Sequence, residues 1–77
     1  MEREEIISEF AANLRAERAR KKYTQEYLAE RADVTTEYIT KLESENNNPS
    51  IFIVAKIAVT LGVSIDKLVP LDKYLKS

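Results

Sequence analysis

The sequence has 77 residues, with 12 basic and 13 acidic side chains and a formal net charge of −1, which is the size of one domain with a small core. The absence of His and Cys removes the usual ligands of metals and most nucleophile–base pairs, so we expect no metal, no cofactor and no enzymatic activity. The longest apolar run, residues 51–55, is far shorter than the ~20 residues of a membrane-spanning helix, and the acidic N-terminus is unlike a signal peptide, so a cytoplasmic protein is expected.

The first predicted helix covers residues 2–22. Its apolar residues recur at three- and four-residue spacing, as in an amphipathic helix: Ile6, Ile7, Phe10, Ala11 and Leu14. Acids gather at its start and bases at its end, the order that the helix dipole favours. Residues 1–9 are expected to be an N-terminal extension of this helix. Net charge gives no global attraction to nucleic acid, but residues 10–22 form a local basic segment.

Two short helices are predicted next, at residues 25–32 and 36–43. Thr24 and Thr35 can cap their N-termini. Asp33 falls where the chain must reverse within about three residues, and Asp tolerates the left-handed backbone conformation that such a turn uses. Residues 44–50 contain three consecutive asparagines and Pro49, so a loop is expected there.

The fourth predicted helix covers residues 51–61 and ends at Gly62 as its C-terminal cap. Its expected core stripe is Ile51, Val54, Ile57, Ala58 and Leu61. Ser64 is expected to cap a last helix at residues 65–69, which Pro70 stops, and residues 70–77 form a C-terminal tail. The sequence therefore predicts one domain, residues 1–77, that is all-α and folds as a compact five-helix bundle.

Residues 25–44 carry the most specific pattern. Leu28, Ala32, Ile39 and Leu42 are the apolar positions of two short helices, and Val34 fills the turn between them. Ala29 lies where a second helix would cross closely. Two helices joined in this way meet at a steep angle, so the outer face of the second projects from the domain and can enter a DNA major groove.

Several motifs lie at characteristic spacings along the chain: the start Thr24-Gln25, the pair Leu28-Ala29, the run Tyr38-Ile39-x-x-Leu42-Glu43, and then Asn48-Pro49-Ser50, Ala55-Lys56-Ile57-Ala58 and Leu61-Gly62-Val63-Ser64. Together they resemble the Cro/C1-type helix-turn-helix family of phage repressors over about residues 10–69. The departures are Asp33, where the family usually has Gly, and the acidic character around the third helix. The resemblance implies the fold of the phage-repressor DNA-binding domain, with residues 25–44 as its helix-turn-helix motif.

The resemblance also implies a set of contacts with double-stranded DNA. Thr36, Glu37 and Lys41 are the expected base readers, with Thr35 and Thr40 beside them. The phosphate backbone is the expected partner of Gln25, Tyr38 and the loop residues Asn46 and Asn47. Without the family match, the same residues would read as a solvated helix face, a first-turn glutamine and a bare turn, and the Tyr38 ring could equally rest against the domain. The chemistry permits base contacts, because Lys donates to guanine, Glu accepts from cytosine and a Thr methyl can meet the thymine methyl.

Arg18 and Glu43 are interpreted as structural. In the family, the matching residues form a partly buried ion pair that joins the first helix to the end of the third, and the alternative is two unpaired surface charges.

The fourth helix has more apolar residues than one core stripe needs. Phe52, Ile53 and Val59 lie beyond the stripe, and Leu71, Leu75 and Tyr74 add apolar side chains after the last helix. Either the N-terminal segment with Ile6 and Ile7 covers the surplus or a second subunit does. We favour a homodimer, with Phe52, Ile53, Val59, Leu71 and Tyr74 as candidates for its interface.

The predicted function is a dimeric, sequence-specific DNA-binding regulator of transcription that represses by occupying an inverted-repeat operator. Two alternatives are a protein-interaction module of the same fold that has lost DNA binding, favoured by the acidic segment at residues 33–45, and an antitoxin or a restriction–modification controller. No small-molecule ligand is inferred.

Overall fold

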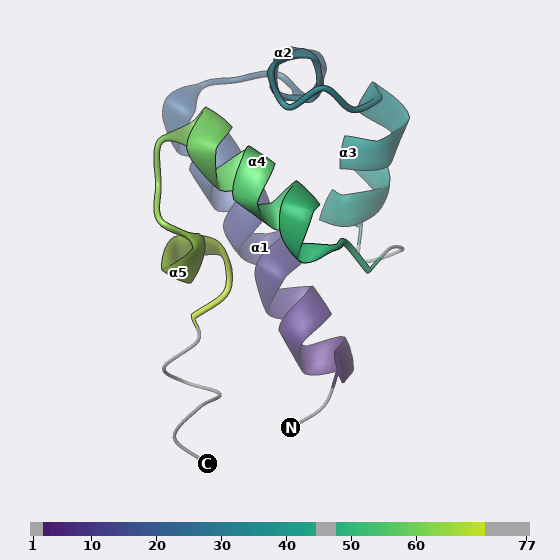
Figure 1. Ribbon diagram of the computed structural model, residues 1–77, viewed down its shortest axis with the longest axis vertical. Coiled ribbons are helices and arrows are strands. Elements are labelled where there is room, and N and C mark those ends of the chain that lie inside the picture. Colours follow the sequence, from purple (N-terminus) through teal and green to yellow (C-terminus); the bar gives the residue numbers. More distant parts are fainter. Residues whose placement is uncertain (1–2, 45–47, 71–77) are drawn as a thin grey trace.

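The computed structural model describes residues 3–44 and 48–70, and these form five helices (Figure 1). Their bounds are α1 Arg3–Lys21, α2 Gln25–Arg31, α3 Thr36–Glu43, α4 Ile51–Leu61 and α5 Ile65–Leu68. The described residues contain no strand. The prediction of an all-α five-helix bundle is therefore confirmed.

The helix ends follow from local chemistry. The hydroxyls of Thr24, Thr35 and Ser50 accept hydrogen bonds from the backbone amides three residues later, as N-capping residues do. Ser64 is the N-cap residue of α5, as predicted, and has the same backbone conformation, but its side chain makes no cap hydrogen bond. The reason is that the amide of Lys67 already donates to the backbone carbonyl of Ser64, at 3.0 Å.

Within residues 3–44 and 48–70, three residues have a left-handed backbone. Asp33 has φ 61° and Gly62 has φ 70°, in agreement with the predicted turn at Asp33 and the predicted C-terminal cap at Gly62. Lys22, with φ 62°, was missed, and it ends α1 one residue before the predicted boundary. Ala32 is the C-cap of α2, with φ −88° and ψ 0°, so α2 is also one residue shorter than predicted.

The core lies between all five helices. Its members are Phe10, Leu14, Leu28, Ala29, Ala32, Ile39, Leu42, Val54, Ile57, Ala58, Leu61 and Leu68. Ile51 was expected among them and is instead 68% exposed. It is the first residue of α4, where side chains point back past the end of the helix. Ile53, expected outside the stripe, is half-buried and packs against the core.

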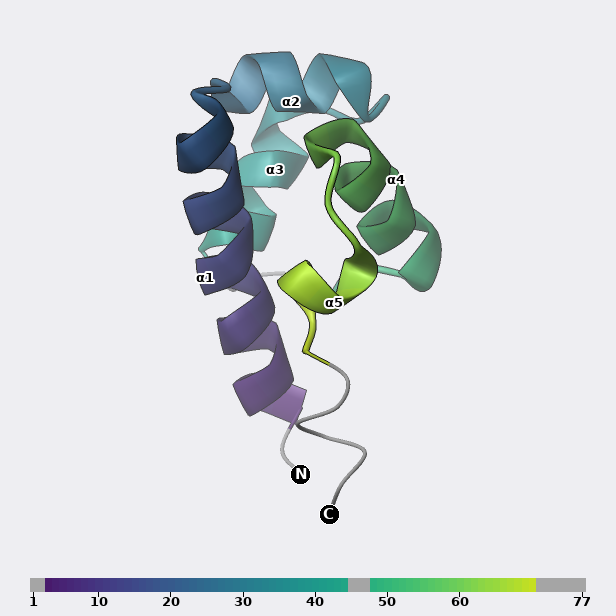
Figure 2. The ribbon, with the colours of Figure 1, turned by 90° about the vertical axis from the view of Figure 1, so that its left-hand side faces the viewer.

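The helices are arranged as two parts. α1 and α4 lie on either side of α5, α2 lies across one end of the molecule, and α3 runs from that end along one side of the bundle (Figures 1 and 2). The side-chain amide of Asn13 donates to the carbonyl of Leu68 at 3.0 Å, which ties α5 to α1. None of the described helices has the length and apolar character needed to cross a bilayer.

Candidate nucleic-acid interface

α2 and α3 form a compact helix–turn–helix unit. Of the described helices, these two make the most extensive pairwise contact. Ala29 is only 2% exposed, as a close helix crossing requires. The amide of Val34 donates to the carbonyl of Ala29 at 2.9 Å, and this bond closes the turn. α3 consequently lies at the edge of the molecule, with one long side free of other helices (Figure 1).

The free side of α3 is polar. Thr36, Glu37, Thr40 and Lys41 are all exposed, and so is the capping residue Thr35. Thr36 with Thr40, and Glu37 with Lys41, are four residues apart and therefore neighbours on one helix face. The structure thus gathers the predicted base readers on one surface. Tyr38 is half-buried and packs against the core, so its ring rests against the domain.

One buried carboxylate holds the far end of α3. Glu43 is 6% exposed, and its Oε2 lies 2.6 Å from Nε of Arg18. A second bond runs from Nη2 of Arg18 to Oε1, at 3.1 Å, so the ion pair is bidentate. Arg18 also donates to the carbonyl of Tyr23 at 2.8 Å, and Arg15 donates to the backbone carbonyl of Glu43. The two predicted partners are therefore joined, and two arginines of α1 anchor the C-terminal end of α3.

Gln25 extends this network to the exposed face of α3. Its Nε2 donates to Oε1 of Glu43 at 2.9 Å, and its Oε1 accepts from the hydroxyl of Thr40, also at 2.9 Å. The sequence interpretation assigned Gln25 to a phosphate and missed these bonds. A buried carboxylate has more lone pairs than one arginine fills, and this was the available signal that a further donor should lie beside Glu43.

The basic end of α1 lies beside the start of α2. Lys21 and Lys22 are exposed and line an open hollow of about 370 Å³ together with Tyr23, Thr24 and Tyr27. The rings of Tyr23 and Tyr27 have centroids 4.6 Å apart, and the guanidinium of Arg31 lies 4.9 Å from the Tyr27 centroid. Positive charge therefore lies beside the start of α2. The loop residues Asn46 and Asn47 lie outside the described residues.

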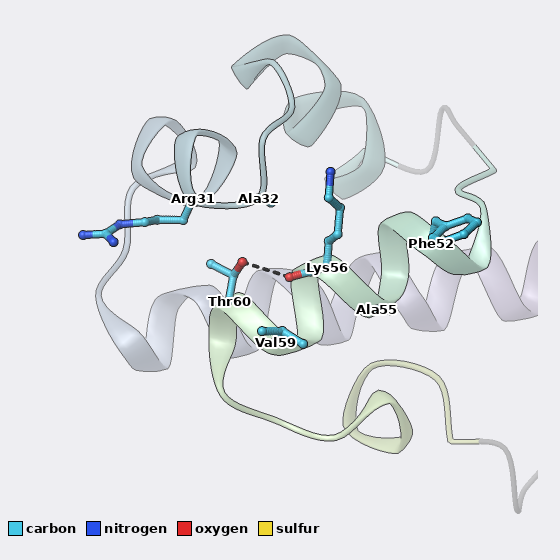
Figure 3. A pocket seen from close by; sticks show the side chains of 7 residues that line it. All are labelled: Arg31, Ala32, Phe52, Ala55, Lys56, Val59 and Thr60. Carbon is cyan, nitrogen blue, oxygen red and sulfur yellow. Dashed lines mark hydrogen bonds between the residues drawn. The ribbon is translucent and has the colours of Figure 1, made fainter.

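A second surface lies on α4. Phe52 and Val59 are each 80% exposed, and with Ala55, Lys56, Thr60, Arg31 and Ala32 they line an open hollow of about 310 Å³ (Figure 3). Figure 3 shows Phe52 pointing away from the helix bundle and Val59 on the open side of α4. Ile6 and Ile7 lie instead beside Phe10, Pro49 and Val54. The N-terminal segment therefore does not cover Phe52 or Val59. Leu71 and Tyr74 lie outside the described residues.

No metal site accompanies these surfaces, since no three acidic side chains within residues 3–44 and 48–70 come together closely enough to hold a metal ion.

Known proteins resemble the chain in sequence and in structure. A family described as helix-turn-helix matches residues 14–68. The immunity repressor protein of Bacillus phage phi105 is 30% identical over 63 residues, which cover 82% of this chain and 44% of the repressor. The chain thus spans less than half the length of that relative.

Two solved structures extend the comparison. The clp gene regulator ClgR of Corynebacterium glutamicum has a TM-score of 0.79 and 30% identity, over 82% of this chain and 67% of that chain. The restriction-modification controller protein C.AhdI of Aeromonas hydrophila has a TM-score of 0.78 and 27% identity, over 80% of this chain and 94% of that chain. The match over residues 14–68, the likeness to these proteins and the α2–α3 geometry show that the chain belongs to the Cro/C1-type helix-turn-helix family of transcription regulators.

Proposed function

We propose that this protein is a sequence-specific DNA-binding regulator that binds an inverted repeat as a homodimer and represses transcription by occupying it. The observation that carries this proposal is the exposed polar face of α3, which projects from the bundle while its C-terminal end is anchored by Arg15 and Arg18. A recognition helix must be both accessible and rigid, and this arrangement supplies both properties. The proposed location is cytoplasmic.

Three residues of the α3 face are assigned to base readout. Lys41 donates to guanine O6 or N7, Glu37 accepts from the N4 amine of cytosine, and the methyl of Thr36 meets the thymine methyl. Glu37 repels phosphates, so it also selects against sequences that offer it no amine.

Affinity for DNA that does not depend on the base sequence comes from the basic end of α1. The formal net charge is −1, so attraction to the phosphates relies on local groups such as the exposed Lys21 and Lys22. Further phosphate contacts are assigned to Gln25, Asn46 and Asn47, and to the hydroxyl of Tyr38, whose ring packs against the core. Gln25 has two amide hydrogens, of which one is directed at Glu43, so the other is available to a phosphate oxygen.

A homodimer is supported by the exposed apolar side of α4. Phe52 and Val59 lie on one stripe seven residues apart, with Ala55 and Lys56 between them. A stripe of this kind can pair with a copy of itself about a two-fold axis, because Phe52 of each subunit then meets Val59 of the other. Two α3 helices about 34 Å apart would then read half-sites one DNA turn apart.

Selection from a random DNA duplex library at about 150 mM salt tests the proposal. The expected product is an inverted repeat with half-site centres about 10–11 bp apart. Lys41→Ala should relax the preferred base at one position per half-site by roughly tenfold, whereas Lys67→Ala, which removes an exposed lysine of α5, should leave every base preference unchanged. If the unaltered protein enriches no sequence, and its weak binding disappears as salt rises, the regulator proposal is wrong.

A second candidate within the same class is a controller-type regulator that both activates and represses. It is favoured by the likeness to the restriction-modification controller C.AhdI, 94% of which is covered. A reporter gene placed under the selected operator separates the two, because a pure repressor lowers expression at every protein concentration, whereas a controller raises it over part of the range.

A further inference from the structure

Four side chains connect α1 to the DNA-facing side of α3 through hydrogen bonds that all have a defined direction. The Arg18 guanidinium and the Gln25 side-chain nitrogen both donate to the Glu43 carboxylate, and the Gln25 side-chain oxygen accepts from the Thr40 hydroxyl. A guanidinium can only donate and an ionised carboxylate can only accept. The ion pair therefore determines which group donates at each later bond.

The orientation of the Gln25 amide follows from its neighbour. The Glu43 carboxylate needs a donor, so the nitrogen of the amide must lie at 2.9 Å from Oε1 of Glu43. The amide oxygen of Gln25 is then directed at Thr40 and can only accept. A flipped amide would place two oxygens together beside a buried negative charge, which the low local dielectric makes costly.

The Thr40 hydroxyl can donate its hydrogen only to an acceptor within the protein. The hydroxyl carries a single hydrogen, and its two contacts are both acceptors within the protein, the Gln25 amide oxygen at 2.9 Å and the Thr36 carbonyl at 3.1 Å. With either partner, the hydrogen is directed into the protein. What the exposed oxygen offers to solvent is a lone pair.

We propose that Thr40 meets DNA as a hydrogen-bond acceptor and takes an N–H from the exocyclic amine of adenine or cytosine in the major groove. This inference rests on the proposed function. Adenine N6 and cytosine N4 are the donors that the major groove presents, whereas guanine and the phosphates present acceptors there. The buried pair of Arg18 and Glu43 thereby sets the base preference of a residue that it does not touch.

The hydrogen-bond chain is tested first in the protein without DNA. Gln25 is the only glutamine in the sequence, so its side-chain amide gives one assignable pair of NMR signals. Thr40→Val removes the hydroxyl and keeps the shape, and it should shift this pair and speed its hydrogen exchange. Thr60→Val is the matched control, because the Thr60 hydroxyl also donates to a carbonyl four residues earlier, on α4, and it should leave the Gln25 signals unchanged. An unaltered Gln25 pair in Thr40→Val would overturn the inference.

Operator selection with three proteins then tests the polarity. The position read by Thr40 is the one at which Thr40→Val or Thr40→Ser differs from the unaltered protein. The unaltered protein and Thr40→Ser, which keeps the hydroxyl, should both prefer adenine or cytosine there, and Thr40→Val should lose about threefold to tenfold of that preference.

Three results would overturn the inference: a preference for guanine that Thr40→Val loses, a preference for thymine that Thr40→Val keeps and Thr40→Ser loses, or no position that differs. If the unaltered protein selects no DNA at all, the proposed function and the role of Thr40 on DNA fail together. The NMR result would then still stand for the hydrogen-bond chain itself.

Discussion

At the scale of single residues, the buried side chain of Glu43 connects several parts of the fold. It is the only polar residue of the described chain that is buried, and it joins three helices through Arg18 of α1 and Gln25 of α2. All of its contacts come from donors, so the charge is compensated. A buried charge of this kind becomes costly as soon as one partner is removed.

Glu43→Ala is therefore expected to lower the free energy of unfolding by about 3 kcal/mol, because it leaves the half-buried guanidinium of Arg18 without its carboxylate. Glu37→Ala, which removes an exposed acid from the same helix, should cost less than about 0.5 kcal/mol. Urea unfolding followed by circular dichroism measures both. Equal losses for the two variants would show that Glu43 has no special role in stability.

Asp33 offers a test of backbone strain at one position. Its φ is 61°, and its side chain is 93% exposed with only a 4.0 Å contact to Lys56. Asp33→Gly and Asp33→Ala both remove the carboxylate, but only Ala keeps a Cβ that the left-handed region disfavours. The Gly variant should therefore be about 1 kcal/mol more stable than the Ala variant in thermal or urea unfolding. A more stable Ala variant would contradict this assignment.

At the scale of helices, the N-cap residues differ in whether their side chain makes a cap hydrogen bond. The Ser50 hydroxyl accepts from the amide of Ile53 at 3.3 Å, whereas the Ser64 hydroxyl makes no cap bond. Both serines are exposed and have nearly the same backbone angles. They form a natural pair for comparing the hydrogen bond itself.

Ser50→Ala should destabilise the protein by about 1 kcal/mol, and Ser64→Ala by only a few tenths of that value, because only the first variant loses a cap hydrogen bond. Urea midpoints of the two variants, taken with the unaltered protein, check the difference. Matching losses would mean that the cap bond of Ser50 contributes nothing measurable.

At the scale of the whole molecule, the exposed apolar side of α4 controls assembly in our proposal. The bundle buries its core without help from Phe52 or Val59, so these side chains can be changed with little effect on folding. This separation between folding and self-association allows the dimer to be tested directly.

Phe52→Ser is expected to weaken self-association by about tenfold or more, since a large aromatic side chain that an interface buries contributes strongly to binding. Ala12→Ser changes an exposed apolar residue of α1 and should not alter it. Sedimentation equilibrium measures both, and circular dichroism verifies that both remain folded. A protein that is monomeric before any substitution would disprove the proposed homodimer.

The sequence by itself determined the features that depend on near neighbours. Helix periodicity, the caps at Thr24 and Thr35 and the left-handed turn at Asp33 were all predicted, because each is decided within a few residues along the chain. The pattern of residues 25–44 also identified the helix–turn–helix unit and its outward face. The same reasoning missed Lys22, whose left-handed backbone has no glycine to signal it.

Only the tertiary structure decided the features that join distant segments. Gln25 meets Glu43 and Thr40, which are 18 and 15 residues away, and no periodicity relates residues on different helices. Ile51 and Ile53 exchanged their expected places because the burial of a side chain depends on what packs against its helix and not on spacing alone. The direction of the hydrogen bonds at Thr40 belongs to this second class, since it is set by a charge pair at the other end of the network.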